Sequence, residues 1–107
     1  MPILAAVDDF LFRSKIRAVA KHVNAEVAFA QTADEILAQA RAVRPALLIF
    51  DLNSQKADAT LAGIRTIAFA SHVHVDLIAA AKKAGADQVL ARSQFAGNLA
   101  EILAAAT

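Results

Sequence analysis

The stretch Pro45-Ala46-Leu47-Leu48-Ile49-Phe50-Asp51 decides the fold of this chain. A short, unbroken apolar run that ends at an acidic residue is typical of a strand covered on both faces of a parallel sheet. The preceding pair, Arg44-Pro45, ends a helix, because proline disfavours the helical region for the residue before it. We therefore predict a strand over residues 46–50, with Asp51 at its carboxyl end.

The same alternation of short apolar runs and segments of helical period continues on both sides of this strand. It predicts repeated strand–helix units around a five-stranded parallel sheet, which is an α/β fold. The other predicted strands are 3–7, 26–30, 66–70 and 88–91, and the predicted helices are 11–23, 32–43, 75–84 and 95–106, with a loop and a short helix over 52–65.

Local signals mark several of these boundaries. Thr32-Ala33-Asp34-Glu35 has the spacing of a capping box at a helix start. Asn24 and Gly85 stand where a helix should end, since both residue types adopt the left-handed conformation common at helix C-termini.

The composition limits the function classes. A chain of 107 residues forms one domain, 1–107, and its apolar runs are far shorter than the roughly 20 residues of a membrane span. The net charge of +1 is scattered, which does not favour nucleic-acid binding. The absence of cysteine and of a signal peptide before Asp8-Asp9 favours the cytoplasm. We expect protein partners, no nucleic acid and no membrane association.

Asp8, Asp9 and Asp51 follow two of the predicted strands. Ligands bind beyond the carboxyl ends of strands in open parallel sheets, and right-handed crossovers place the first and third strands side by side. Clustered carboxylates repel, and their oxygens suit Mg²⁺, Mn²⁺ or Ca²⁺. The alternative is a set of local roles: Asp8 caps a helix, Asp9 is an acid in its first turn, and Asp51 forms a turn.

Three segments together resemble the receiver domains of response regulators, of the kind found in chemotaxis regulators. They are 6–10 with Arg13 and Arg17 after it, 45–53, and 79–87 with its Ala-Gly-Ala turn. The resemblance covers nearly the whole chain and implies the flavodoxin-like strand order 2-1-3-4-5. The segment between Asp51 and Ser71 is short for this family, so we expect a shortened third helix.

The resemblance also implies a site. Asp51 would be the phosphoacceptor and a metal ligand, while Asp8 and Asp9 would hold Mg²⁺ or Mn²⁺, Asp9 directly. Asn53 would contribute its backbone carbonyl to the metal. The cation would neutralise phosphoryl oxygens during an in-line transfer, which depends chiefly on positioning and charge stabilisation.

Two positions depart from the family pattern. Ser71 would take the place of the family's switch hydroxyl, the side chain that hydrogen-bonds a bound phosphoryl group. An alignment without gaps, counted back from the Ala-Gly-Ala turn, puts Ala70 at that position instead. Arg92-Ser93 replaces the family's lysine and proline. Arginine keeps the charge, but its planar fork differs from a compact ammonium. The chain thus resembles a divergent or degenerate receiver.

The resulting prediction is a stand-alone receiver that is no turnover enzyme. It would accept phosphate on Asp51 from a histidine kinase or phosphotransfer protein and act on a downstream protein. We also expect a homodimer that forms through the face made by 75–84, 88–91 and 95–106. The alternative is a pseudo-receiver, a binding or dimerisation module independent of phosphorylation, in which Arg92 pairs with Asp51. A phosphohydrolase with Asp51 as nucleophile is less favoured, because the sequence shows no cap and no second catalytic aspartate.

Overall fold

The computed structural model describes residues 2–7, 9–52, 64–71, 75–83 and 85–106. Strands and helices alternate along most of this part of the chain, as the apolar pattern predicts. The elements are β1 (Ile3–Ala6), α1 (Phe10–His22), β2 (Val27–Phe29), α2 (Ala33–Val43), β3 (Leu47–Asp51), β4 (Thr66–Ala70), α3 (Val75–Lys83), β5 (Gln88–Ala91), α4 (Arg92–Gly97) and α5 (Leu99–Ala105).

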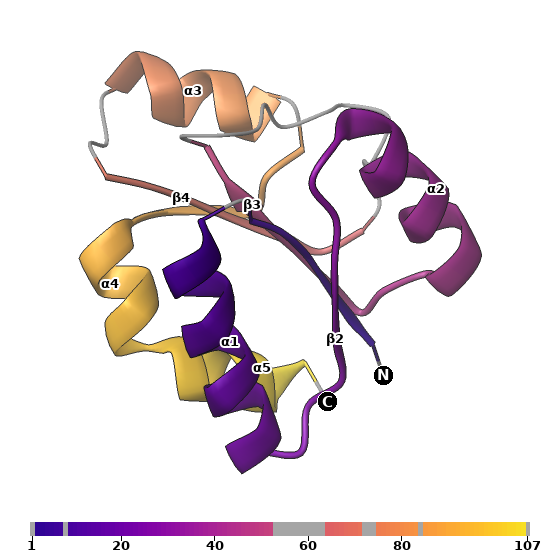
Figure 1. Cartoon of the computed structure of the whole chain (residues 1–107). Coiled ribbons are helices and arrows are strands. Elements are labelled where there is room, and N and C mark those ends of the chain that lie inside the picture. The colour runs from indigo at the N-terminus through magenta and orange to yellow at the C-terminus, as the bar shows by residue number, and fades with distance from the viewer. Residues whose placement is uncertain (1, 8, 53–63, 72–74, 84, 107) are drawn as a thin grey trace.

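All five strands pair in parallel, in the order β2-β1-β3-β4-β5. This confirms the flavodoxin-like order 2-1-3-4-5. Helices α2 and α3 cover one face of the sheet, and α1, α4 and α5 cover the other (Figure 1). The central strand β3 is buried along its whole length, which explains its continuous apolar run.

The face covered by α1, α4 and α5 is packed with large side chains. Three phenylalanine rings stack in its centre, with ring centroids 4.9 Å apart for Phe12 and Phe69 and 4.5 Å apart for Phe69 and Phe95. Phe69 and Phe95 are fully buried, and Leu99 and Leu103 of α5 pack into the same cluster. This aromatic stack ties β4 to α1 and α4.

The opposite face is packed with smaller residues. Buried alanines, among them Ala40 of α2 and Ala81 of α3, lie against Leu48 and Phe50 of β3. Because alanine adds little volume, the helices of this face can lie close to the sheet. The buried alanines of α2 and α3 thus contribute to a close contact between these helices and the sheet.

The helix ends follow the local signals of the sequence. Thr32 Oγ1 accepts a hydrogen bond from the Glu35 amide at 3.1 Å, as the capping box predicts. Asn24, two residues after α1 ends, and Arg44, the residue after α2, adopt positive φ angles of 58° and 47°, and Gly85 has a φ of 112°. Helices therefore end where the sequence supplies a residue that tolerates the left-handed region or precedes a proline.

The helices are short and one-sided. The longest, α1, has 13 residues, and its buried residues Phe12, Ile16 and Ala20 recur every fourth position on the face toward the sheet. Within the described residues, no helix has the length and apolar character needed to cross a bilayer.

The prediction of one terminal helix over 95–106 was wrong. The chain enters α4 directly at Arg92, and α4 and α5 are separated at Asn98. Asn98 departs from helical geometry, with φ −109° and ψ 12°, and its Nδ2 donates to the Gln94 carbonyl at 3.0 Å. Gly97 before it adds local freedom that weakens a helix. The expected shortened third helix falls on 53–63, outside the described residues.

We expect Phe95→Ala to lower the free energy of unfolding by about 3–5 kcal/mol, because it removes the fully buried ring at the end of the aromatic stack. Urea denaturation followed by circular dichroism measures this loss. Phe10→Ala is the matched control: Phe10 is 71% exposed, so the change should stay within about 0.5 kcal/mol. Equal losses in the two variants would contradict the role of the stack.

Candidate functional site

The ends of β1 and β3 meet at the carboxyl edge of the sheet, as predicted. Ala6 of β1 pairs with Phe50 of β3, so Asp51 lies at the same edge as the chain that leaves β1 toward Asp9. On its other side Asp51 pairs with Phe69 of β4. Asp51 is only 2% exposed, which makes it one of the few buried polar residues of the described chain. A buried carboxylate at the end of the central strand is a strong candidate for function.

Asp9 is the N-cap of α1. Its Oδ1 accepts hydrogen bonds from the backbone amides of Leu11 at 2.9 Å and Phe12 at 3.2 Å. The alternative interpretation of the sequence placed Asp8 at this cap and Asp9 in the first turn, and that assignment is wrong. The helix begins at Phe10, which puts Asp9 at the capping position.

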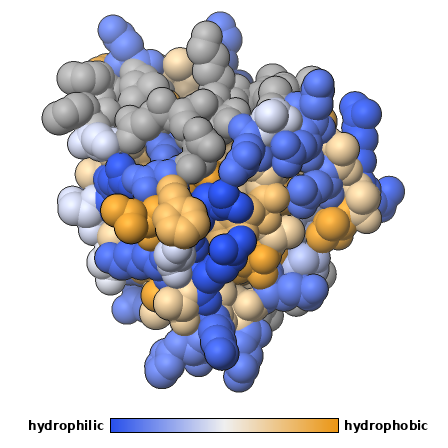
Figure 2. Space-filling model, in the orientation of Figure 1, coloured by the Kyte–Doolittle hydropathy of each residue, from blue (hydrophilic) through white to orange (hydrophobic). Residues whose placement is uncertain are grey.

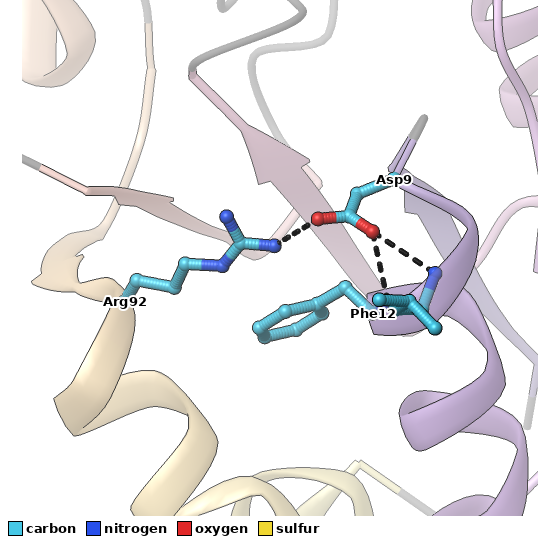
Figure 3. A network of polar contacts seen from close by, with 4 residues as sticks. Asp9, Phe12 and Arg92 are labelled. Atoms are coloured by element: carbon cyan, nitrogen blue, oxygen red, sulfur yellow. Dashed lines mark hydrogen bonds and ion pairs between the residues drawn. The ribbon is translucent and has the colours of Figure 1, made fainter.

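Arg92 reaches across the edge of the sheet to the second oxygen of Asp9. Its Nη2 donates to Asp9 Oδ2 at 2.5 Å, although the two residues lie 83 positions apart. Figure 3 shows the guanidinium extending from the start of α4 toward Asp9, with the ring of Phe12 beside it. Both oxygens of Asp9 are therefore engaged, Oδ1 by the helix and Oδ2 by the guanidinium.

The ring of Phe12 supports this guanidinium. The Arg92 Cζ lies 4.7 Å from the centroid of the Phe12 ring, a distance at which a cation is attracted to an aromatic face. The sequence analysis did not identify Phe12 as part of this site. The only signal was its position, three residues after Asp9 on the inward face of α1.

These contacts lower the pKa of Asp9. The largest cause is the hydrogen bond from Arg92, followed by the one from the Phe12 amide, and both favour the ionised carboxylate more than partial burial disfavours it. The side chains of Arg92 and Asp9 are 32% and 38% exposed. Asp9 thus stays ionised throughout the neutral and mildly acidic range.

The other predicted site residues are placed only in part. Asp8 and Asn53 lie outside the described residues, and their roles stay predictions. Ala70 ends β4, is 1% exposed and pairs with Ala91, whereas the exposed Ser71 follows it. The choice between them as switch position also stays a prediction.

The donor atoms at this edge suit a hard cation. Asp9 and Asp51 offer carboxylate oxygens, and oxygen ligands are what Mg²⁺ and Ca²⁺ prefer. Among the residues that the structure describes, no group of three or more acidic, histidine or cysteine side chains gathers in a ligand set. A cation that binds Asp9 directly must share or displace the Arg92 contact.

An apolar surface lies beside this edge. Phe10 and Leu11, at the start of α1, are 71% and 79% exposed. Figure 2 shows an orange patch over the start of α1, next to hydrophilic residues. Large exposed apolar side chains of this kind are typical of surfaces that contact other proteins.

We expect Arg92→Gln to raise the pKa of Asp9 toward the usual range of an aspartate, because the variant removes the main cause of its depression. A carboxyl-carbon NMR titration measures this. The lowered pKa stabilises the folded state above the pKa of the unfolded chain, and this contribution disappears as the pH falls through the folded value. The variant should therefore lose less stability on acidification than the wild type. An unchanged Asp9 pKa would contradict the assignment.

Searches against protein-family models and curated proteins found no match. Solved structures do match. A receiver domain from Bermanella marisrubri aligns with a TM-score of 0.78 and 19% identity, over 98% of this chain and 96% of that one. An orphan response regulator of H. pylori aligns with a TM-score of 0.77 and 12% identity, over 95% and 92%.

A third match shows what a related fold can bind. It is a response regulator from Burkholderia pseudomallei with a phosphorylated aspartic acid, a calcium ion and citrate, and it aligns with a TM-score of 0.75 and 22% identity, over 97% of this chain and 71% of that one. Together these matches extend over nearly the whole length of the present chain. The chain therefore has the receiver fold of response regulators.

Proposed function

We propose that this domain is a signalling receiver that accepts a phosphoryl group on Asp51, with Mg²⁺ as the cation. The observation that carries the proposal is the placement of Asp51, a buried carboxylate at the end of the central strand, beside the chain that leads from β1 to Asp9. In the matched Burkholderia regulator an aspartic acid is phosphorylated and a calcium ion is present. Asp51 is the described aspartate best placed for the same chemistry.

In this proposal a carboxylate oxygen of Asp51 attacks the phosphorus of a phosphohistidine donor, and the bond to the donor nitrogen breaks. Mg²⁺, when bound, neutralises charge on the phosphoryl oxygens. The side chains of Asp8, Asp9 and Asp51 and the backbone carbonyl of Asn53 would hold the cation. Arg92 lies at the same edge through its contact with Asp9 and would supply a further positive charge to the phosphoryl group.

The partners of a two-component receiver are, in general, kinases. We propose a histidine kinase or phosphotransfer protein as the donor and a protein as the downstream target. The exposed Phe10 and Leu11, which follow Asp9 at the start of α1, offer an apolar contact surface beside the acidic edge. Phosphorylation would shift the populations of the face formed by α3, β5, α4 and α5, which carries the output and a homodimer contact.

A second candidate function rests on the engagement of both Asp9 oxygens. Because Arg92 already neutralises Asp9, the guanidinium can stand in for a cation and keep the edge in one state. The domain would then be a pseudo-receiver that binds its partner or dimerises without phosphorylation. The sequence predicts Asp51 as the partner of Arg92 in a pseudo-receiver, and this is wrong, because the contact of Arg92 is with Asp9.

We expect beryllofluoride, a mimic of the phosphoryl group, to bind the wild-type domain only when Mg²⁺ is present. Asp51→Asn should abolish binding, because it removes the nucleophilic carboxylate oxygen. Fluorine NMR of the bound reagent measures this directly, and labelling by a small phosphodonor gives a second readout. Asp34→Asn, which alters an exposed aspartate in the first turn of α2, is the matched control and should bind like the wild type.

The two functions give opposite results in this experiment. A receiver binds the mimic and changes its partner affinity or oligomeric state when Mg²⁺ and the mimic are added. A pseudo-receiver binds neither, and its association with a partner or a second copy stays the same. Binding of the mimic to Asp51→Asn would rule out Asp51 as the acceptor.

A further inference from the structure

The edge of the sheet opposite to Asp51 contains an open hollow of about 700 Å³. Its described lining residues place it where α2 ends and where the chain enters β3 and β4. The lining residues come from the end of α2, from the turn into β3 and from the approach to β4: Ala40, Arg41, Arg44, Pro45, Ala46, Ile64 and Arg65. None of them belongs to the acidic edge described above.

Three arginines line this hollow. Arg41, Arg44 and Arg65 are exposed, and none of them forms an ion pair with a residue that the structure describes. Arg41 lies in the last turn of α2, where a positive charge offsets the negative end of the helix dipole. Arg44 and Arg65 lie outside the helices and form no ion pair with a described residue. Their positive charge is therefore available to a ligand.

One carboxylate lies close by but is already engaged. Asp87 lines a neighbouring hollow of about 440 Å³, which shares Ile64 and Arg65 with the first. Its Oδ2 accepts a hydrogen bond from the Thr66 amide at 2.8 Å. Among the described residues that line the larger hollow none is acidic, and the three arginines give this described lining a positive charge.

Backbone hydrogen bonds fix two of these arginines next to the end of α2 and the start of β4. Arg44 has a left-handed conformation, and its amide donates to the Ala40 carbonyl at 3.1 Å. The Arg65 carbonyl accepts from the Leu48 amide of β3 at 2.8 Å. The start of β3 is fixed in turn by a hydrogen bond from the Ala46 amide to the Pro2 carbonyl at 2.9 Å. Their Cα positions are set before any ligand arrives, which lowers the ordering cost of binding.

The other described lining residues are apolar. Ala40 and Pro45 are buried, and Ala46 and Ile64 are half-buried. Ligand sites of roughly 300–1,000 Å³ commonly combine an apolar wall with a few polar groups that orient the ligand. Guanidinium groups match the geometry of phosphate oxygens and bind them bidentately.

We propose that this hollow binds a small phosphorylated molecule with an apolar or aromatic body. Arg44 and Arg65 hold the phosphate group, and the body lies against Pro45, Ala46 and Ile64. This site is separate from Asp51 and does not depend on phosphorylation of the domain.

Naphthyl phosphate is a suitable probe, titrated into the intact chain in the presence of EDTA so that no metal can bridge phosphate to the acidic edge. Backbone and arginine side-chain NMR signals should shift at Arg44, Ala46 and Arg65. Naphthol and inorganic phosphate should each bind more weakly than naphthyl phosphate, because each lacks one half of the recognised molecule. Raising the salt concentration should weaken binding.

The double variant Arg44→Gln/Arg65→Gln should lower the affinity about tenfold or more, because it removes two charge-assisted hydrogen-bond donors. Lys15→Gln/Lys21→Gln on α1 changes the net charge equally and should bind like the wild type. Arg44→Lys/Arg65→Lys should bind with intermediate affinity, and circular dichroism checks that all variants fold. The proposal is overturned if naphthyl phosphate shifts no signal at the hollow, if either lone component binds as tightly, or if the two glutamine variants bind alike.

Discussion

The burial of β3 on both faces of the parallel sheet is the constraint on which the rest of the structure depends. A strand without a solvent face can hold a carboxylate only where it ends, and the strand runs from Leu47 to Asp51. Because β1 lies parallel beside β3, the residues that follow β1 reach the same edge. The acidic site is therefore a consequence of strand direction and order, and the helices that bury the sheet also bring their N-termini to this edge.

At this edge, packing and electrostatics depend on the same side chains. Phe12 takes part in the aromatic stack of the core and also lies beside the guanidinium of Arg92, while Asp9 caps the helix that carries Phe12. The contact between Arg92 and Asp9 thus joins the start of α1 to the start of α4. A change in the charge at Asp9 would directly change its ion pair with Arg92, the first residue of α4. This connection gives the site a physical route to the face of the molecule that carries α4, β5 and α3.

The sequence was sufficient for the parts of the fold that local physics determines. Unbroken apolar runs identified all five strands, and Thr32, Arg44 and Gly85 marked helix boundaries, whereas the strand order came from a family resemblance. The break at Asn98 was missed because both flanking segments have helical period. The partner of Arg92 could not be chosen from sequence, since Asp9 and Asp51 reach the same edge and only the geometry of α1 and α4 selects Asp9.

A titration with Mg²⁺, followed by the amide NMR signals of Asp9 and Asp51, tests most directly whether these strand ends form one cation site with Arg92 as its competing charge. We predict that both signals shift together in the wild type, and that Arg92→Gln binds Mg²⁺ more tightly because the guanidinium no longer occupies Asp9 Oδ2. The absence of a shift at both positions in both proteins, or weaker binding in the variant, would contradict a shared site.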